Sequence, residues 1–213
     1  MTAWSETRAT AAIAILTIVV SGLITLAGLE RDAAIVGGFI PVLASGASLP
    51  PDIGFVLPYW LTPLSATLIH AGFVHLALNL VMLVYCGQQT ERAVGMRGIV
   101  ILYLVGAYAA ALGQWVQDPA SIAPMIGASG AISAVVGAYA LLFGQSRARP
   151  LGPIPAGFVH VVWLAAAWIG ILLMIGIAGL GGATRIAIGA HIGGFLAGLA
   201  LARPLLLWRY RGA

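Results

Sequence analysis

Residues 125–143 read MIGASGAISAVVGAYALLF, and almost every side chain in this stretch is apolar. From Ser129 to Phe143 the stretch predicts an apolar helix inside a membrane, because few polar groups interrupt it. Ser129 stands at the head of this helix, with Gly127 and Gly130 close on either side. A small hydroxyl at the entrance of such a helix is the first candidate functional group in the chain.

The composition excludes a water-soluble globule. The chain has 213 residues, of which 61% are hydrophobic and 8% are charged, and its mean hydropathy is +1.04. A soluble domain carries about 25% charged residues, so this chain has too little polar surface to face water. Its apolar runs are about 15–20 residues long and are separated by Gly, Pro and Arg, which favours helices over a barrel of alternating strands. We therefore predict an all-α, polytopic membrane protein with one domain, residues 1–213.

The charges and the single cysteine restrict the possible partners. The net charge is +4, but all ten basic residues are arginines scattered between the apolar runs. They indicate membrane topology, and no nucleic-acid partner is expected. Cys86 is the only cysteine, so an internal disulfide and a cysteine-based metal site are excluded. No metal and no cofactor is expected, and the lipid bilayer is the expected environment.

Six membrane spans fit the pattern: 10–29, 72–88, 98–116, 129–143, 157–178 and 186–206. An even number of spans puts both termini on one side, and eight of the ten arginines then lie there, with only Arg31 and Arg185 opposite. The positive-inside rule makes this side cytoplasmic, in the cell (inner) membrane. The run Thr10–Leu29 is long enough to span, and no convincing small-residue cleavage site follows it. We therefore interpret it as a retained helix and not as a signal peptide.

The longest predicted connection, about residues 30–71, is external in this topology. It contains SLPPDIGFVLPYWLTPLSATLIH, which is apolar, proline-rich and aromatic, unlike a solvated linker. This composition predicts a first external loop that lies half-embedded in the membrane interface beside the bundle.

Four polar side chains are predicted to lie at a similar depth in the membrane. Measured from the cytoplasmic end of each helix, Ser129 lies about 21 Å up, His191 and Asn79 about 18 Å, and His75 about 24 Å. In a hydrocarbon core about 30 Å thick, all four fall in the outer half. Polar groups in a membrane are costly and usually face an internal cavity with partners, so the shared depth predicts a site.

Each of these residues also has a structural interpretation. A lone serine in a membrane helix usually bonds a carbonyl of its own helix or lets helices approach. A lone histidine is more often a packing or relay residue than a catalytic one, and Asn79 alone would join helices. Ser133 lies four residues after Ser129 on the same helix face, and we assign it to packing.

The combination favours hydrolysis of a peptide bond by a serine nucleophile. His191 can take the proton of the Ser129 hydroxyl, and the start of a helix leaves backbone N–H groups unpaired beside it. His75 and Asn79, four residues apart, share a helix face and can both donate to a developing oxyanion. Because no acidic residue lies at this depth, the pattern predicts a Ser–His dyad and not a triad.

Small residues surround both members of the predicted dyad. Gly127 and Gly130 remove bulk beside Ser129, so a substrate backbone can approach closely. The stretch GAHIGGFLAGL around His191 contains two pairs of glycines spaced four residues apart, the pattern of close helix packing. If the fourth and sixth spans pack along these glycines, Ser129 and His191 come within hydrogen-bond range.

These motifs together resemble the rhomboid family of intramembrane serine proteases. The resemblance covers about residues 37–200 and rests on five motifs: GGFIP at 37–41, HAGFVHLALN at 70–79, ERAVG at 91–95, GASG at 127–130 and AHIGG at 190–194. The serine motif differs from the GxSxG elbow of soluble hydrolases, because Ala131 stands where the second glycine would be.

The resemblance implies a six-helix core and a role for each matched residue. It implies that Ser129 is the nucleophile and that His191 is the general base. An oxyanion hole would be formed by His75, Asn79 and the Ser129 N–H. Supporting residues would be His70, Gly127, Gly130 and Glu91, the last as a structural contact on the cytoplasmic side.

The resemblance also implies the substrate class, and the chain departs from the family pattern at two places. Substrates would be single-span membrane proteins, cut near the outer membrane face. In the first loop, Trp60 precedes Leu61, where many members carry a Trp-Arg pair. Ser133 occupies a position where many members carry an aromatic residue that stacks on the catalytic histidine. His160 matches no residue to which we assign a role.

Two other functions are compatible with the composition. A catalytically inactive binder of transmembrane helices would be expected to lack the nucleophile or the base, and both are present here. A small transporter with histidine and asparagine along its pathway would move solute in liposomes and would not react with a serine inhibitor. Other intramembrane proteases are disfavoured, because the chain has no HExxH motif and no span with the required pair of aspartates.

Overall fold

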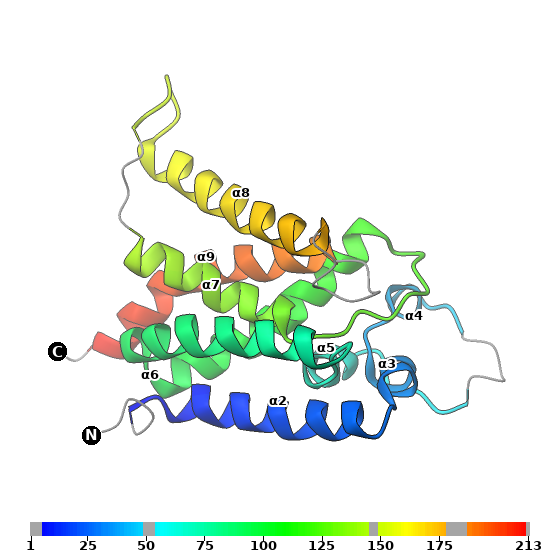
Figure 1. Ribbon diagram of the computed structural model, residues 1–213. Helices are drawn as coiled ribbons and strands as arrows, with labels where there is room; N and C mark the ends of the chain where they lie inside the picture. The colour runs from blue at the N-terminus through cyan, green and yellow to red at the C-terminus, as the bar shows by residue number, and fades with distance from the viewer. Residues whose placement is uncertain (1–5, 49–53, 145–148, 178–186, 212–213) are drawn as a thin grey trace.

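The computed structural model describes residues 6–48, 54–144, 149–177 and 187–211, and these residues form helices joined by loops (Figure 1). The helices are α2 (Arg8–Leu26), α3 (Glu30–Gly37), α4 (Pro41–Ala44), α5 (Thr62–Ser65), the 3-10 helix η2 (Ala66–Leu68), α6 (Phe73–Gln117), α7 (Ser129–Phe143), α8 (Ala156–Ile177) and α9 (Ile188–Tyr210). Within the described ranges, β-pairing is limited to two isolated bridges. The prediction of an all-helical protein with several apolar helices is confirmed.

Helix α6 contains a reversal of the chain. Gly95, inside this 45-residue helix, has φ 79° and ψ 169°, a conformation that glycine adopts without a Cβ clash. The ribbon turns back at this point, so that both ends of α6 lie near the short helices of the first loop (Figure 1). Its two halves, residues 73–94 and 96–117, correspond to the second and third predicted spans.

Three predicted boundaries were wrong by a few residues. The sixth predicted span ended at residue 206, but α9 continues to Tyr210. The first helix ends at Leu26 and not at residue 29, because the chain turns at Gly28 (φ 68°) before α3 begins. The second predicted span ended at residue 88, but its helix continues to Gly95, so ERAVG forms the last turn. Arg209 donates to the main-chain carbonyls of Glu91 and Arg92, and these bonds satisfy carbonyls that a helix end leaves without partners.

Helix α9 packs against α7 through one pair of its glycines. A Cβ on Gly194 would overlap the carbonyl of Gly130, and a Cβ on Gly198 would overlap that of Ala134. Both contacts advance by four residues in the same direction, so α7 and α9 run parallel. The glycine contact stated above as a condition for the fourth and sixth predicted spans is present between α7 and α9.

The other glycine pair of α9 faces a different helix. A Cβ on Gly193 would overlap the carbonyl of Ala109 in the second half of α6, and Gly189 lies against Gly113. At the far end of the same pair of helices, Arg209 lies beside Gly95. This half of α6 is therefore antiparallel to α9. One pair of glycines on α9 packs against α6, and the other pair packs against α7.

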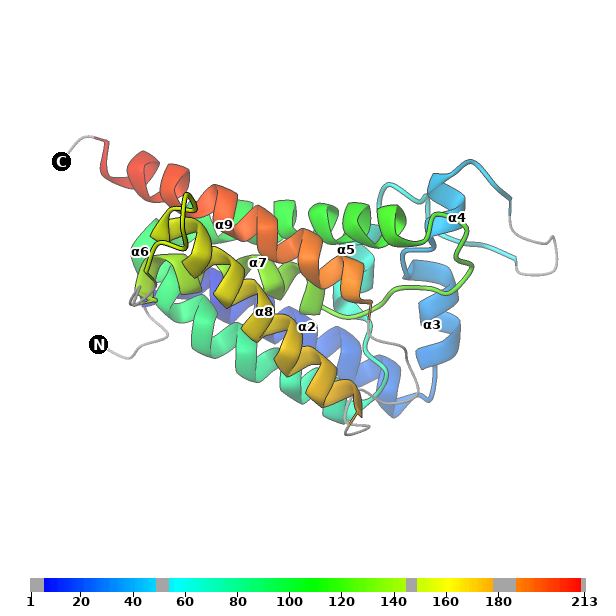
Figure 2. The same cartoon turned by 90° about the horizontal axis from the view of Figure 1, so that it is seen from above.

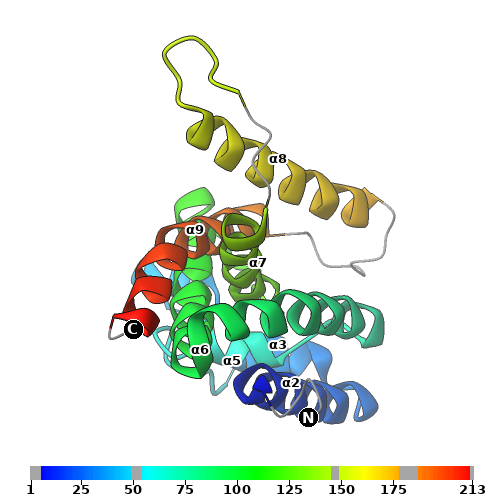
Figure 3. The ribbon, with the colours of Figure 1, turned by 90° about the vertical axis from the view of Figure 1, so that its left-hand side faces the viewer.

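Helix α8 lies at the outside of the bundle, alongside α9 and α7 (Figures 2 and 3). Among the α8 side chains that the structure describes, Trp168 is buried, with 7% of its surface exposed, whereas Phe158, Val162 and Trp163 are 60%, 49% and 64% exposed. An apolar helix that exposes several large apolar side chains suits a lipid-facing position.

In the part of the chain that the structure describes, three helices, α2, α6 and α9, are long and apolar enough to cross a membrane, and α7 is a shorter apolar helix of 15 residues. The start of α2 and the end of α9 lie at one end of the bundle, because Glu91 and Arg92 contact residues near both. This arrangement is compatible with an even number of passes, and the count of six stays a prediction. Parts of the fifth and sixth predicted spans, residues 178 and 186, lie outside the described residues.

Candidate active site

Ser129 is the first residue of α7, as its sequence position predicts. The loop before it is held by main-chain contacts. Met125 forms a two-way bridge with Phe39, with N···O distances of 3.0 and 2.8 Å. The N–H of Gly127 donates to the carbonyl of Ala66 at 2.9 Å, and Gly127 has φ +107°, which favours glycine. The loop conformation thus leaves the Ser129 N–H at a helix start, where the helix itself supplies no acceptor.

His70 fixes the residue immediately before the serine. The N–H of Ala128 donates to His70 Nε2 at 3.3 Å, so this nitrogen is an acceptor and Nδ1 carries the proton. His70 Nδ1 then donates to Ser21 Oγ at 2.7 Å, and Ser21 donates to the carbonyl of Leu68. His70 is fully buried, and burial lowers the pKa of its imidazole below the ordinary value, with a smaller contribution from His75. A neutral His70 therefore links α2 to the loop before α7.

The protonated ring nitrogen of His75 lies close to Gly127, beside Ser129. The N–H of Ala71 donates to His75 Nδ1 at 3.3 Å, so in the neutral ring the proton is on Nε2. A Cβ built on Gly127 would lie 2.9 Å from His75 Nε2 and 3.7 Å from Ser129 Oγ. The imidazole and the hydroxyl thus flank the same small space beside Gly127, which a side chain there would fill.

Asn79 lies one turn further along α6 and is buried. Its Nδ2 donates one hydrogen to the main-chain carbonyl of His75 at 2.9 Å, which leaves a second amide hydrogen for another acceptor. Its Oδ1 is buried without a hydrogen-bond partner in the described part of the chain. A buried amide oxygen without a hydrogen bond lowers the stability of the fold. Packing alone therefore does not explain an asparagine at this position.

His191 is oriented by its own helix. Its Nδ1 lies 2.8 Å from the carbonyl of Ala187, and because a carbonyl only accepts, Nδ1 must carry the proton. Nε2 of the neutral ring is then the bare nitrogen that can accept a proton. The side chain is 5% exposed and forms part of the lining of a small cavity between α8 and α9.

The packing of α7 on α9 places Ser129 and His191 beside the same contact between the two helices. Gly194 contacts Gly130, and the Cβ of Ala190 would lie 3.8 Å from a Cβ on Gly130. Ser129 precedes Gly130 and His191 follows Ala190, so the hydroxyl and the imidazole belong to residues next to the contact. Within the described ranges no hydrogen bond joins Ser129 Oγ to His191.

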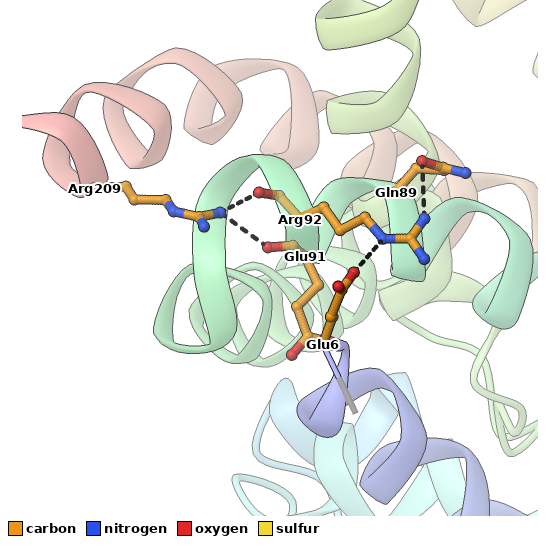
Figure 4. A network of polar contacts seen from close by, with 5 residues as sticks. All are labelled: Glu6, Gln89, Glu91, Arg92 and Arg209. Atoms are coloured by element: carbon orange, nitrogen blue, oxygen red, sulfur yellow. Dashed lines mark hydrogen bonds and ion pairs between the residues drawn. The ribbon is translucent and has the colours of Figure 1, made fainter. Parts of the chain in front are cut away.

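Glu91 lies away from these residues, in the last turn of the first half of α6. Its carboxylate accepts hydrogen bonds from the N–H groups of Ala9 (3.0 Å) and Thr10 (2.8 Å), at the start of α2. Figure 4 shows its main-chain carbonyl bound to Arg209, the residue that also bonds Arg92. The carboxylate therefore caps α2 and favours its positive end, which fits the structural role expected of it.

Replacing Glu91 with glutamine is expected to lower the free energy of unfolding by about 1–3 kcal/mol, because two buried N–H groups then bond a neutral oxygen or none. The matched control is Glu6→Gln. Glu6 is exposed and pairs with Arg92 at 3.6 Å (Figure 4), and exposed pairs contribute at most about 1 kcal/mol. Thermal unfolding in detergent micelles measures both. Equal effects of the two variants would contradict the capping role.

The burial of His70 leads to a separate prediction, about the stability of the protein at acidic pH. Its pKa is lower in the folded protein than in the unfolded chain, so below about pH 6.5 the unfolded state binds a proton that the folded state does not. Stability is therefore expected to fall on acidification by about 1.4 kcal/mol per pH unit for this one group. Unfolding of wild type and His70→Gln between pH 7 and 5 tests this. The variant should have the shallower slope, and parallel slopes would contradict the prediction.

Some site contacts were not predicted from the sequence. Trp168 of α8 donates its indole N–H to Ser133 Oγ at 3.1 Å, and Gln117 Oε1 accepts from the N–H of Gly189 at the start of α9. Ser21 completes the His70 network. A small polar residue in an apolar helix is a signal that could have indicated Ser21, whereas nothing in the pattern distinguishes Trp168 from its exposed neighbour Trp163.

The fold and site define a helical membrane protein in which Ser129 starts a helix, His75 borders the same glycine as Ser129, and His191 follows a residue at the contact between α7 and α9. The family model for the rhomboid domain matches residues 58–208. The chain belongs to the rhomboid family.

Curated relatives agree with this assignment. The chain is 29% identical over 157 residues to the rhomboid protease GlpG of Serratia proteamaculans, covering 73% of this chain and 51% of that protein. It is 31% identical over 140 residues to the rhomboid protease GlpG of Yersinia pestis, covering 65% and 45%. It is 30% identical over 144 residues to RHOMBOID-like protein 5 of Arabidopsis thaliana, covering 68% and 43%. The chain thus spans about half the length of the curated relatives it matches.

Proposed function

We propose that this protein is an intramembrane serine endopeptidase that cleaves transmembrane helices of other membrane proteins with a Ser129–His191 dyad. Family membership and the names of two relatives, both rhomboid proteases, support the activity. The single observation that carries the dyad is the tautomer of His191. With Nδ1 committed to the Ala187 carbonyl, the imidazole has its basic nitrogen free for a proton from a neighbouring hydroxyl.

The first half of the reaction follows from these donors and acceptors. Ser129 Oγ attacks the scissile carbonyl while its proton passes to His191 Nε2. Negative charge develops on the substrate oxygen, and three N–H donors are candidates to bind it: the Ser129 main chain, His75 Nε2 and the second amide hydrogen of Asn79. His191 then gives its proton to the leaving amine as the peptide bond breaks, and an acyl-enzyme on Ser129 remains.

Water completes the reaction. His191 takes a proton from water, the hydroxide attacks the acyl carbon, and the same donors bind the oxyanion again. Collapse of this intermediate breaks the bond to Ser129 Oγ, which regains its proton from His191. The missing Ser129–His191 hydrogen bond in the described residues is compatible with this sequence, because catalytic hydrogen bonds are often longer without substrate and tighten in the complex.

The substrates we propose are single-span membrane proteins, with the bilayer as the medium. We further propose that the protein lies in the inner membrane, with the start of α2 and the end of α9 on the cytoplasmic side. Eight of the ten arginines then lie on that side. Ser129 lies at the opposite end of α7 from Phe143, about 21 Å away. A cut near the outer membrane face follows from this orientation.

Cleavage in proteoliposomes tests the proposed function. The purified full chain is reconstituted with a single-span helix that carries small residues near its outer end, and the products are identified by mass. We expect one new amide bond broken near the outer end of the helix, and no cleavage with liposomes alone. An intact substrate, together with solute uptake by the same liposomes, would favour the transporter and contradict the protease.

A further inference from the structure

Helix α8 is tied to the bundle by a chain of two hydrogen bonds that ends at the proposed nucleophile. The indole N–H of Trp168 donates to Ser133 Oγ at 3.1 Å. Ser133 Oγ in turn donates to the main-chain carbonyl of Ser129 at 2.8 Å. Donor and acceptor roles are consistent along the chain, because an indole only donates, a carbonyl only accepts and a hydroxyl does both.

The same indole borders the proposed base. Trp168 and His191 line one small cavity between α8 and α9, together with Ala165, Ile192, Phe195 and Leu196. Apart from His191 and the indole N–H, which is bonded to Ser133, the side chains of this cavity are apolar. On the α8 side, Trp168 is therefore the bulky group that limits how the imidazole can move and how much water reaches it.

The remaining restraint on the imidazole is slight. Nδ1 is bonded to Ala187, but a single hydrogen bond leaves the ring free to tilt about it. The titratable side chain that interacts with His191 from another packed element is His75 of α6, a residue proposed to bind the oxyanion. The orientation of Nε2 thus depends on the walls of the cavity.

We propose that Trp168 is a positioning residue: its indole, anchored on Ser133, holds the His191 imidazole in the orientation that accepts the Ser129 proton. This inference rests on the proposed function of Ser129 and His191. It assigns α8 a part in assembling the site, because the bond that docks the helix also fixes the wall beside the base. It also gives Ser133, assigned to packing from the sequence, an acceptor role.

Three variants separate the hydrogen bond from the bulk of the ring. Trp168→Phe keeps an aromatic wall but loses the donor, and Ser133→Ala loses the acceptor. The double variant removes both. Trp163→Phe is the matched control, because Trp163 is on the same helix and 64% exposed. Thermal unfolding of each variant in micelles verifies that it is folded, and kcat and KM are measured with the single-span substrate.

We expect each single variant to lower kcat by about 3–10-fold with KM unchanged, which is the size expected for one lost hydrogen bond. The double variant should be no slower than the slower single variant, because the two residues act through one bond. The control should match wild type. Wild-type kcat in both single variants, additive losses, or faster cleavage from a loosened α8 would each overturn the positioning role.

Reaction with a fluorophosphonate distinguishes the two possible failures. If wild type neither cleaves the substrate nor reacts at Ser129, the proposed function fails and the inference falls with it. If wild type does both and the Trp168→Phe and Ser133→Ala variants react at the wild-type rate, the proposed function stands and only the positioning role is lost. A slower reaction of both variants, parallel to their loss of kcat, would support it.

Discussion

Ser129→Ala and His191→Ala are each expected to reduce cleavage of a reconstituted transmembrane substrate by at least about 10⁴-fold. Without Oγ no acyl-enzyme can form, and without the imidazole no neighbouring group takes the hydroxyl proton. Because nucleophile and base act as a unit, the double variant should be no slower than the slower single variant. Initial rates of product formation, followed by gel or mass spectrometry, measure this loss.

Two controls accompany these variants. Ser121→Ala changes a loop serine whose Oγ accepts a long hydrogen bond from Ala123, and it should cleave at the wild-type rate. Ser129→Ala should retain its fold and still bind the substrate helix, because the hydroxyl makes no hydrogen bond in the described part of the chain. Cleavage by purified Ser129→Ala at a rate near wild type would remove Ser129 from the proposed mechanism.

The second large effect is expected in stability, at Gly198. A Cβ there would overlap the carbonyl of Ala134 and lie 2.8 Å from its Cα, so α7 and α9 would have to separate. Overpacking against backbone, which cannot change rotamer, is expected to cost about 3 kcal/mol or more in Gly198→Ala. The variant should unfold at a markedly lower temperature and lose activity, since α7 carries Ser129 and α9 carries His191.

The matched control for this substitution is Gly22→Ala. Gly22 is inside helix α2 and a Cβ there would meet no atom within 4 Å. Alanine has the higher helix propensity, so stability should be unchanged or rise by up to about 1 kcal/mol. If both variants have the same unfolding temperature, the glycine contact does not hold the two helices together in the way described.

The sequence predicted the elements whose signal is local. The apolar runs predicted the helices, the glycine stripe predicted the contact between α7 and α9, and the position of Ser129 predicted its place at a helix start. The boundaries at residues 29 and 88 were wrong for different reasons: the first depends on a turn inside the apolar run, and the second depends on a contact with a distant residue. Gly28 ends α2, and Arg209, 118 residues from Glu91, completes the end of the first half of α6.

Contacts between distant elements could not be predicted from the sequence, for a physical reason. The capping of α2 by Glu91 and the bond from Trp168 to Ser133 join residues 82 and 35 positions apart. Neither changes the local hydrophobic pattern, so each partner looks like an ordinary residue of its own helix. The tautomers of His75 and His191 likewise depend on main-chain partners that appear only when the helices are built.

The central claim is that Ser129 is a nucleophile activated by His191, and covalent labelling with a fluorophosphonate tests it most directly. Attack by Oγ forms a phosphorus–oxygen bond, fluoride leaves and the proton passes to the imidazole. Intact-mass analysis of the wild-type chain should find one added group, located on Ser129 by peptide mapping, and none on Ser129→Ala or His191→Ala. Labelling of folded Ser129→Ala, or full labelling of Ser129 in His191→Ala, would contradict the account.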